Sequence, residues 1–422
     1  LPALPLRAGD AFTAEQVVHD WYRLILELVR HTPTYSPPVA SRAFAYVGLT
    51  LFEALAARPE SGLRSLAGQV TALPPCAALA AGLDPAAVAQ GALSRAVASF
   101  FGNTGPTGQR AMVAMQARIG ERLTAALGAE ALAKGQQAGA QVFDHILAYS
   151  ATDGGAVVEN MGFPLTYTPA PDPGAWVPTS LIRQQQAPLL PLWGTNRPFA
   201  LPSATACALP APTEYSEDPS SRFYAEAMEV YEAVRNVTPE QEIIARFWSD
   251  DPMLSPTPPG HWIFIALDVL ELEAAPVERR AEVLAMLGMG LADAFIACWQ
   301  SKYEFNTIRP VTYIKAHIDK GWEPLLITPP FPEFPSGHST QSGAAAAVLT
   351  HLFGDNYAFE DRTHEDEGFE PRAFASFNDA AEEAGMSRLY GGIHFMPAIT
   401  EGLAQGRCVG GHIARLTTRK DA

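Results

Sequence analysis

The sequence predicts an all-α protein of two packed helical bundles, joined by a long proline-rich irregular connection. Hydrophobic residues make up 48% of the 422 residues, with abundant alanine and few runs of β-branched residues. Apolar positions recur at helical spacing through both halves of the chain. Residues 153–217 lack this periodicity and are rich in Pro, Gly, Thr and Ser. This segment therefore separates an N-terminal bundle (1–152) from a C-terminal bundle (218–422).

The N-terminal bundle is expected to be a scaffold. Thr13, followed by Glu15 and Gln16, is a reasonable helix start, and the Ala and Gly of the second helix suit close helix packing. Its histidines are scattered along the chain rather than clustered, so we assign them structural roles. Helices are expected at about 14–31, 39–57, 85–101, 108–126 and 128–149.

The connection, residues 153–217, is too long for an ordinary loop, and long loops of this kind are usually functional or disordered. It carries Trp176, Trp193 and Phe199, which favours an ordered covering segment. We expect it to lie over the bundles near the site entrance.

The C-terminal bundle is expected to hold the functional site. Pro239 suits the first position of a helix, and Glu240 and Glu242 follow it at the positive end of the helix dipole. The acidic stretch 355–370 lacks the spacing of a calcium loop and is expected to be a solvated surface loop. Helices are expected at about 218–235, 238–250, 259–272, 278–303, 310–319, 337–353, 373–390 and 398–417.

Charge and hydropathy exclude two classes of protein. The formal net charge of −16 argues against nucleic-acid binding, which needs a basic surface. No uninterrupted apolar stretch reaches about 18 residues, so no membrane span is expected. The chain starts at Leu1 without an initiator Met, which fits a trimmed signal peptide and a secreted or periplasmic protein.

Cysteine usage is compatible with export. Cys76 and Cys207 lie in proline-rich loop sequence, whereas Cys298 and Cys408 lie in helical sequence. A disulfide between Cys76 and Cys207 would suit an exported protein, and free buried thiols are the alternative.

The stretch from Lys302 to His394 carries the chemistry. Its cations are Lys302, Arg309 and Arg388, and its imidazoles are His338 and His394. Arginine offers planar bidentate donors and lysine a compact charge, and each charge-assisted hydrogen bond contributes roughly 1.5–3 kcal/mol. Such a set suits a small tetrahedral or bipyramidal oxyanion with several negative charges.

A helix start completes the predicted oxyanion site. Ser336-Gly337-His338 runs into a Ser- and Ala-rich helical segment, so the free amides and the positive dipole end of this helix face the anion. Gly337 lacks a side chain, and its N–H can approach an oxygen closely. Arg309 precedes Pro310, which places it in extended backbone between two helices.

Three motifs together form a recognisable signature: Lys302-x6-Arg309-Pro310, Pro335-Ser336-Gly337-His338 and Ser387-Arg388-x5-His394. This pattern resembles the one shared by vanadium-dependent haloperoxidases and type 2 phosphatidic-acid phosphatases. The resemblance implies vanadate as the cofactor. The residues that would bind it are Lys302, Arg309, Ser336, Gly337, Arg388 and His394.

The resemblance also implies individual roles. His394 would be the direct ligand of the metal, and His338 would be the acid–base group. A carboxylate after Trp248 would orient His338; Asp251 fits this position, with Asp250 as the rival. The family pattern places another carboxylate four residues after His394, where this chain has Ala398.

Lys302 would stabilise negative charge that accumulates during the reaction. Trp299, three residues before Lys302, and Phe331, five before Ser336, resemble the halide-pocket pair of the chloroperoxidase branch. Packing in the hydrophobic core is the alternative for both rings.

The predicted function is a vanadium-dependent haloperoxidase. It would oxidise chloride or bromide with hydrogen peroxide to hypohalous acid, which halogenates a small organic acceptor. The alternative is a soluble acid phosphatase that forms a phosphohistidine at His394; Trp299, Phe331, the large N-terminal helical half and the lack of membrane spans weigh against it. Homo-oligomerisation is left open.

Overall fold

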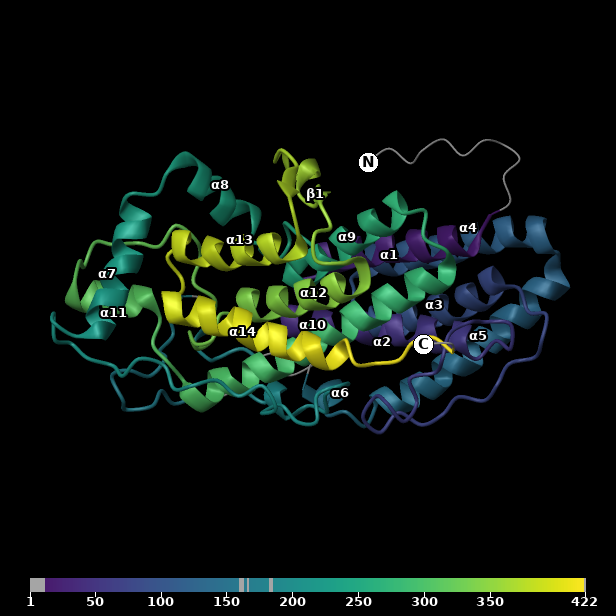
Figure 1. Ribbon diagram of the computed structural model, residues 1–422, viewed down its shortest axis with the longest axis horizontal. Helices are drawn as coiled ribbons and strands as arrows, with labels where there is room; N and C mark the ends of the chain where they lie inside the picture. The colour runs from purple at the N-terminus through teal and green to yellow at the C-terminus, as the bar shows by residue number, and fades with distance from the viewer. Residues whose placement is uncertain (1–11, 159–162, 165–166, 182–184, 421–422) are drawn as a thin grey trace.

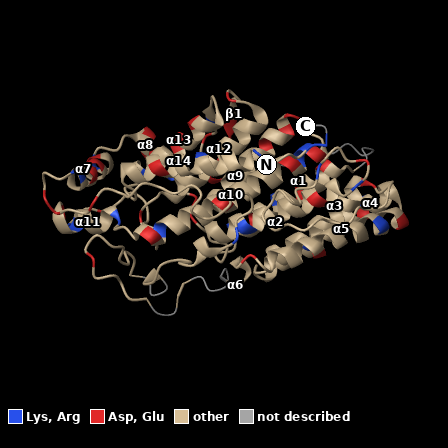
Figure 2. Cartoon of the chain, turned by 60° about the horizontal axis from the view of Figure 1, so that its bottom comes forward, with Lys and Arg blue, Asp and Glu red and all other residues tan. Residues whose placement is uncertain are grey.

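A computed structural model describes residues 12–158, 163–164, 167–181 and 185–420. Over these residues the regular secondary structure is helical apart from one short two-stranded sheet, which confirms the predicted all-α class. The molecule is elongated, with α1–α5 towards one end and α7 and α11 at the other (Figure 1). Acidic and basic residues are dispersed along its length (Figure 2).

The helices lie close to their predicted positions. In the first half they are α1 (Ala14–Arg30), α2 (Pro37–Ala56), α3 (Pro85–Phe100), α4 (Pro106–Leu127) and α5 (Ala129–Ser150), followed by the short α6 (Gly155–Val158). In the second half they are α7 (Arg222–Arg235), α8 (Pro239–Phe247), α9 (Thr257–Leu272), α10 (Val277–Phe305), α11 (Pro310–His317), α12 (Gly337–Phe353), α13 (Phe377–Tyr390) and α14 (Met396–Ile413).

Helix starts follow from local side-chain chemistry. At α1 the Thr13 hydroxyl accepts from the Gln16 backbone N–H, while the Gln16 side chain accepts from the Thr13 N–H. Thr238 and Gln241 form the same reciprocal cap at α8, with Pro239 at its first position. These contacts satisfy backbone donors that a helix leaves free.

The two halves share one continuous hydrophobic core, in which α2 packs along α10. Glycines permit the close approach: a Cβ on Gly48 would lie 2.7 Å from the carbonyl oxygen of Leu284. Both helices are long and apolar enough to cross a membrane, but 94% and 100% of their most apolar windows are buried inside the protein. They are core helices of a folded domain.

A small hairpin replaces part of the surface loop that the sequence predicts at 355–370. Strand β1 (Phe359–Asp361) pairs antiparallel with β2 (Arg372–Phe374), and the short 3-10 turn η3 (Glu365–Glu367) lies between them. Phe359 and Asp361 are buried, whereas Glu360 is exposed. The expectation of a wholly solvated loop is therefore wrong, because alternate side chains of β1 point inward.

The connection between the halves is largely irregular but firmly attached to the helices. The buried Asp293 of α10 accepts backbone hydrogen bonds from Phe199, Ala200 and Leu201 at 2.6, 2.8 and 3.0 Å. The short 3-10 turn η2 (Trp193–Thr195) also packs on α10. A carboxylate with three such donors fixes the path of the segment.

A disulfide joins Cys207 to Cys408. The sequence leaves open a Cys76–Cys207 disulfide or free thiols, and neither alternative describes Cys207. The Cα atoms of Cys207 and Cys408 are 5.9 Å apart, within the range that a disulfide requires. Gln405, one turn before Cys408 on α14, donates to the Cys207 carbonyl at 3.2 Å. Cys76 and Cys298 are free thiols.

Candidate active site

The first part of the site forms where α10 ends and α11 begins. Asn306 adopts a left-handed conformation (φ 49°) and stops α10. Arg309 has extended backbone (φ −85°, ψ 149°) directly before Pro310, as the sequence predicts. Lys302 and Arg309 both point into the interior and are fully buried.

Lys302 is anchored by backbone carbonyls of the approach to α12. Its ammonium donates to the carbonyls of Pro332 and Glu333 at 2.8 and 3.0 Å, and also to that of Pro335. Burial lowers the pKa of Lys302 to about 7. The side chain thus places a cation at the site and also holds the shape of the loop before Ser336.

Arg309 has one donor group left over. Its Nε donates to the Phe331 carbonyl at 2.8 Å and its Nη1 to the Ile393 carbonyl at 2.9 Å, with Nη1 also 3.3 Å from Nε2 of His394. Its buried Nη2 has no hydrogen-bond partner among the residues that the structure describes. A buried guanidinium N–H without an acceptor is unfavourable, so this group marks a position for a bound anion.

The start of α12 faces the same region. Ser336 caps the helix, and its hydroxyl accepts from the Ser339 backbone N–H at 3.2 Å. Gly337 and His338 occupy the first turn, where backbone N–H groups have no intrahelical acceptor. A Cβ on Gly337 would lie 3.7 Å from the Trp299 ring, so the helix start lies directly against the aromatic side of the site.

Arg388 approaches from the end of α13. It donates to the carbonyls of Ala245 and Trp248 at 3.2 and 2.5 Å, and its Nη1 lies 3.4 Å from Nε2 of His338. Gly392, with φ +75°, then turns the chain after α13 and brings His394 back into the site.

His394 is held by a carboxylate that the sequence analysis misses. Its Nδ1 lies 2.8 Å from Glu333, which also accepts from the Phe395 backbone N–H at 3.0 Å. Arg309 can only donate to Nε2 of His394, so the proton resides on Nδ1 and is donated to Glu333. Glu333 thus occupies the role that the family pattern gives to position 398, where this chain has Ala398.

The charge environment keeps the His394 imidazole neutral. Burial lowers the pKa of His394 well below its ordinary value, and Arg309, Lys302 and Arg388 lower it further. Burial also raises the pKa of Glu333 to about 7. The sequence indicates the role of Glu333 only by its position, as a lone acidic residue inside the apolar stretch Phe331-Pro-Glu333-Phe-Pro.

His338 lies between a cation and a carboxylate. Its Nε2 is 3.4 Å from Nη1 of Arg388 and 3.9 Å from Oδ2 of Asp250. Burial and the charge of Arg388 lower the pKa of His338 well below its ordinary value, against an opposing effect of Asp250. His338 is therefore neutral and able to accept a proton.

The carboxylate beside His338 is Asp250, whereas the sequence analysis favours Asp251. Asp250 follows Trp248 and Ser249 at the end of α8 in a left-handed conformation (φ 51°), which turns its side chain inward. Asp251 is half-buried, and burial raises its pKa. The choice between neighbouring carboxylates depends on one backbone angle, which a residue pattern does not specify.

The predicted halide-pocket pair forms one wall of the site. The rings of Trp299 and Phe331 lie 5.0 Å apart, and the Lys302 ammonium is 5.1 Å from the Phe331 ring centre. The connecting segment closes over them, since the Leu189 carbonyl accepts from the Trp299 indole and the Tyr303 hydroxyl at 3.2 and 2.6 Å. The pair therefore joins the cationic groups to the covering segment.

The donor set fits a vanadate ion. Among the ion pairs between residues that the structure describes, none neutralises the three cations of the site, namely Lys302, Arg309 and Arg388. The unpartnered Arg309 Nη2 and the neutral His394 Nε2 add a donor and a ligand nitrogen. Fold and site together define a helical oxyanion-binding enzyme with one buried and one half-buried imidazole.

Comparisons with known proteins identify the family. The family model "VCPO second helical-bundle domain" matches residues 282–320 and 316–420. The structure of the first bacterial vanadium-dependent iodoperoxidase has 34% sequence identity and a TM-score of 0.86, covering 95% of this chain and 96% of that one. The chain belongs to the vanadium-dependent haloperoxidases, oxidoreductases with vanadate as the cofactor.

More distant structures share the fold. A holo-type bacterial vanadium-dependent chloroperoxidase has 16% identity and a TM-score of 0.68, covering 92% of each chain. The apo-type enzyme has 16% identity and a TM-score of 0.66, covering 92% of this chain and 94% of that one. No curated protein sequence matches the chain. The family assignment confirms the predicted haloperoxidase and does not favour the phosphatase alternative.

Proposed function

We propose that the convergent cations, the start of α12 and His394 form the vanadate site of this haloperoxidase, and that iodide is its preferred halide. The observation that carries the proposal is the convergence of three buried cations on the neutral Nε2 of His394. None of the three makes a direct ion pair with a residue that the structure describes. The iodoperoxidase with 34% identity supports the choice of iodide.

Vanadate, when bound, supplies a Lewis-acid centre that activates hydrogen peroxide. In this chain the residues that would hold it are Lys302, Arg309, Ser336, Gly337, Arg388 and His394. Glu333 fixes the tautomer of His394, so that Nε2 presents its lone pair to the metal. The arginines and the first amides of α12 would bind its oxygens, and Lys302 would stabilise negative charge at the site.

Neutral His338 accepts a proton from hydrogen peroxide at Nε2 and returns one when hypohalous acid leaves. Arg388 keeps the imidazole neutral beforehand, and Asp250 stabilises the imidazolium that forms. Trp299 and Phe331 exclude water from the side where the halide would approach, and their polarisable rings suit a large halide.

We also propose that the protein is exported, to the periplasm or outside the cell. The Cys207–Cys408 disulfide supports an oxidising compartment. A small organic acceptor remains a prediction of the sequence, which leaves homo-oligomerisation open.

The test is a halide comparison on purified protein. Metal-stripped enzyme is reconstituted with vanadate and assayed with hydrogen peroxide and iodide, bromide or chloride, beside hydrolysis of p-nitrophenyl phosphate without vanadate. We expect peroxide-dependent oxidation fastest with iodide. It should be lost in His394→Ala and retained in His31→Ala, whose side chain lies exposed at the end of α1. Phosphate-ester turnover without halide oxidation, or a preference for chloride, would contradict the proposal.

A further inference from the structure

A chain of buried titratable groups extends from His338 away from the oxyanion site. Nδ1 of His261 lies 2.9 and 3.1 Å from the two oxygens of Asp250, the carboxylate beside His338. Nε2 of His261 lies 2.7 Å from Asp361. The His261 side chain is fully buried between these two carboxylates. The order of contacts is therefore Asp361, His261, Asp250 and His338.

Each member of this chain is fixed by its own element. His261 comes from the first turns of α9, and its ring stacks on Trp248 with ring centres 4.3 Å apart. Asp361 ends β1 and accepts from the backbone N–H and the hydroxyl of Thr363 at 3.0 and 2.7 Å. Asp250 is turned inward by its left-handed backbone. None of these side chains is free to rotate independently.

The protonation of His261 follows from its partners. An ionised carboxylate only accepts hydrogen bonds, so both ring nitrogens of His261 must donate, and only the imidazolium donates from both. Burial disfavours this charge, but Asp250 and Asp361 outweigh it and raise the pKa of His261 to about 10. The His261 imidazole is thus protonated in the folded protein, and its positive charge offsets part of the negative charge that Asp250 presents to His338.

We propose that His261 and Asp361 are positioning residues of the haloperoxidase reaction, which hold the Asp250 carboxylate against His338 and partly neutralise it. The inference rests on the proposed acid–base role of His338. If no other group neutralised the negative charge of Asp250, that charge would favour a protonated His338 in the resting enzyme. With part of that charge taken by His261, His338 stays neutral. The O–H bond of hydrogen peroxide can then break as an N–H bond forms at Nε2, leaving a hydroperoxide anion.

Other charged groups also face this chain. His364 approaches Asp250 at 3.1 Å and Glu367 at 3.2 Å, and Glu367 pairs with Arg30 of α1 at 3.3 Å. Arg388 faces His338. Asp251 and Asp268 lie close enough to influence the cluster electrostatically. His364 is therefore a second cationic partner of Asp250, and only Asp361 acts on Asp250 through His261.

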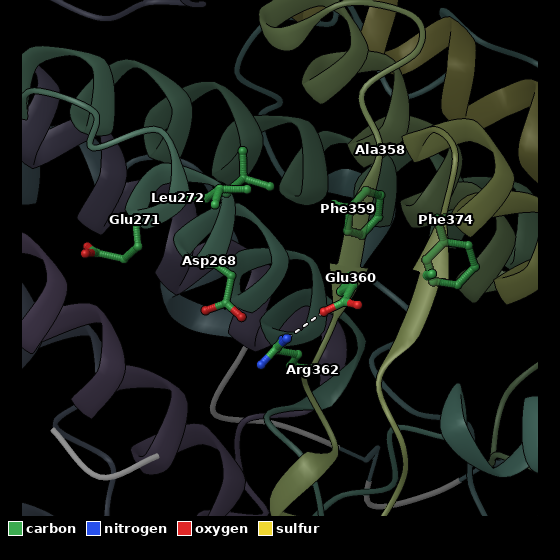
Figure 3. A pocket seen from close by; sticks show the side chains of 10 residues that line it. Asp268, Glu271, Leu272, Ala358, Phe359, Glu360, Arg362 and Phe374 are labelled. Atoms are coloured by element: carbon green, nitrogen blue, oxygen red, sulfur yellow. Dashed lines mark hydrogen bonds and ion pairs between the residues drawn. The ribbon is translucent and has the colours of Figure 1, made fainter. Parts of the chain in front are cut away.

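Strand β1 provides a matched control. Its alternation turns Asp361 towards His261, whereas Glu360 points outward and pairs with Arg362 at the edge of a surface groove of about 640 Å³ (Figure 3). Asp361→Asn and Glu360→Gln each remove one negative charge, from adjacent positions, without a large change in shape. Only the first removes a partner of His261.

The experiment measures the pKa of His338 and the pH profile of the rate in both variants. Histidine-selective ¹⁵N labelling of the vanadate-free protein reports the pKa directly, with His338→Ala for assignment. The acid limb of iodide oxidation reports it during turnover. In Asp361→Asn, His261 loses a carboxylate that keeps it protonated, so less of the Asp250 charge is neutralised. We therefore expect the pKa of His338 and the acid limb of the rate to move upward by about 0.5–1 pH unit. In Glu360→Gln the shift should stay below about 0.2 unit because solvent screens the charge.

His261→Gln removes the cation beside Asp250 and should also move the pKa of His338 upward, which provides a test if Asp361→Asn folds poorly. Equal shifts in Asp361→Asn and Glu360→Gln would overturn the inference. Asp250, His261 and His364 also lie close enough together to bind a metal ion. If the purified protein contained one equivalent of a transition metal and His261→Asn did not, the inference would be overturned as well. A His338→Ala enzyme with an unchanged acid limb would instead refute the proposed role of His338.

Discussion

The two histidines of the site are held in different ways, and the difference matches their proposed roles. His394 makes a direct 2.8 Å hydrogen bond to Glu333, which also accepts from the Phe395 backbone N–H. His338 lies 3.9 Å from Asp250, and Asp250 is already engaged by two other imidazoles. A metal ligand requires one tautomer and one orientation. An acid–base group requires both protonation states to be accessible, which the weaker contact allows.

Removal of Glu333 should therefore impair cofactor binding most. In Glu333→Ala the orientation and tautomer of His394 are no longer fixed, and we expect vanadate affinity to fall by about 10–100-fold. Glu333→Gln should bind more tightly than Glu333→Ala, because its amide oxygen can still accept from Nδ1. Calorimetric titration of the metal-stripped protein with vanadate measures both. Equal affinity in wild type and Glu333→Ala would show that His394 needs no orienting carboxylate.

Asp250→Asn should impair the rate of iodide oxidation rather than vanadate binding. The carboxylate that stabilises protonated His338 is lost, so we expect the rate of iodide oxidation to fall by about 10-fold and its acid limb to move to lower pH. Vanadate affinity should change by less than about 3-fold, since Asp250 does not contact the oxyanion site directly.

Asp251→Asn is the matched control for this prediction. It removes a carboxylate one residue away that makes no ion pair with His338 among the contacts the structure describes. Its rate and pH profile should resemble those of the wild type. If Asp251→Asn lost activity and Asp250→Asn did not, the sequence-based choice of Asp251 would be correct after all.

The contrast between the two histidines also shows where sequence reasoning stops. The helices, the start of α12 at Ser336 and the convergence of the three motifs follow from periodicity, capping chemistry and motif spacing, all of which are local. Glu333 and Asp250 depend on which side of a loop faces the interior, and the Cys207–Cys408 pairing depends on how the connecting segment lies on α14. These relations are set by tertiary packing, so no single segment of the sequence contains them.

The pH dependence of thermal stability tests the protonation of His261, and its expected effect is the smallest of these predictions. The pKa of His261 is about 10 in the folded protein and about 6.5 when unfolded. Its ion pairs therefore contribute fully below about pH 6.5, and their contribution is lost as the pH rises towards 10. The pKa of Lys302 is lowered to about 7, so its contribution changes with pH in the opposite sense. The wild-type melting curve alone would then combine two opposing trends.

A comparison of wild type with His261→Gln separates the two trends, because Lys302 is common to both proteins. We expect the difference in Tm to be largest near pH 6 and to shrink by a few degrees towards pH 10. Calorimetry at half-unit pH steps measures it. A Tm difference that stays constant with pH would mean that His261 is already neutral at pH 6. His261 would then neutralise none of the Asp250 charge that faces His338.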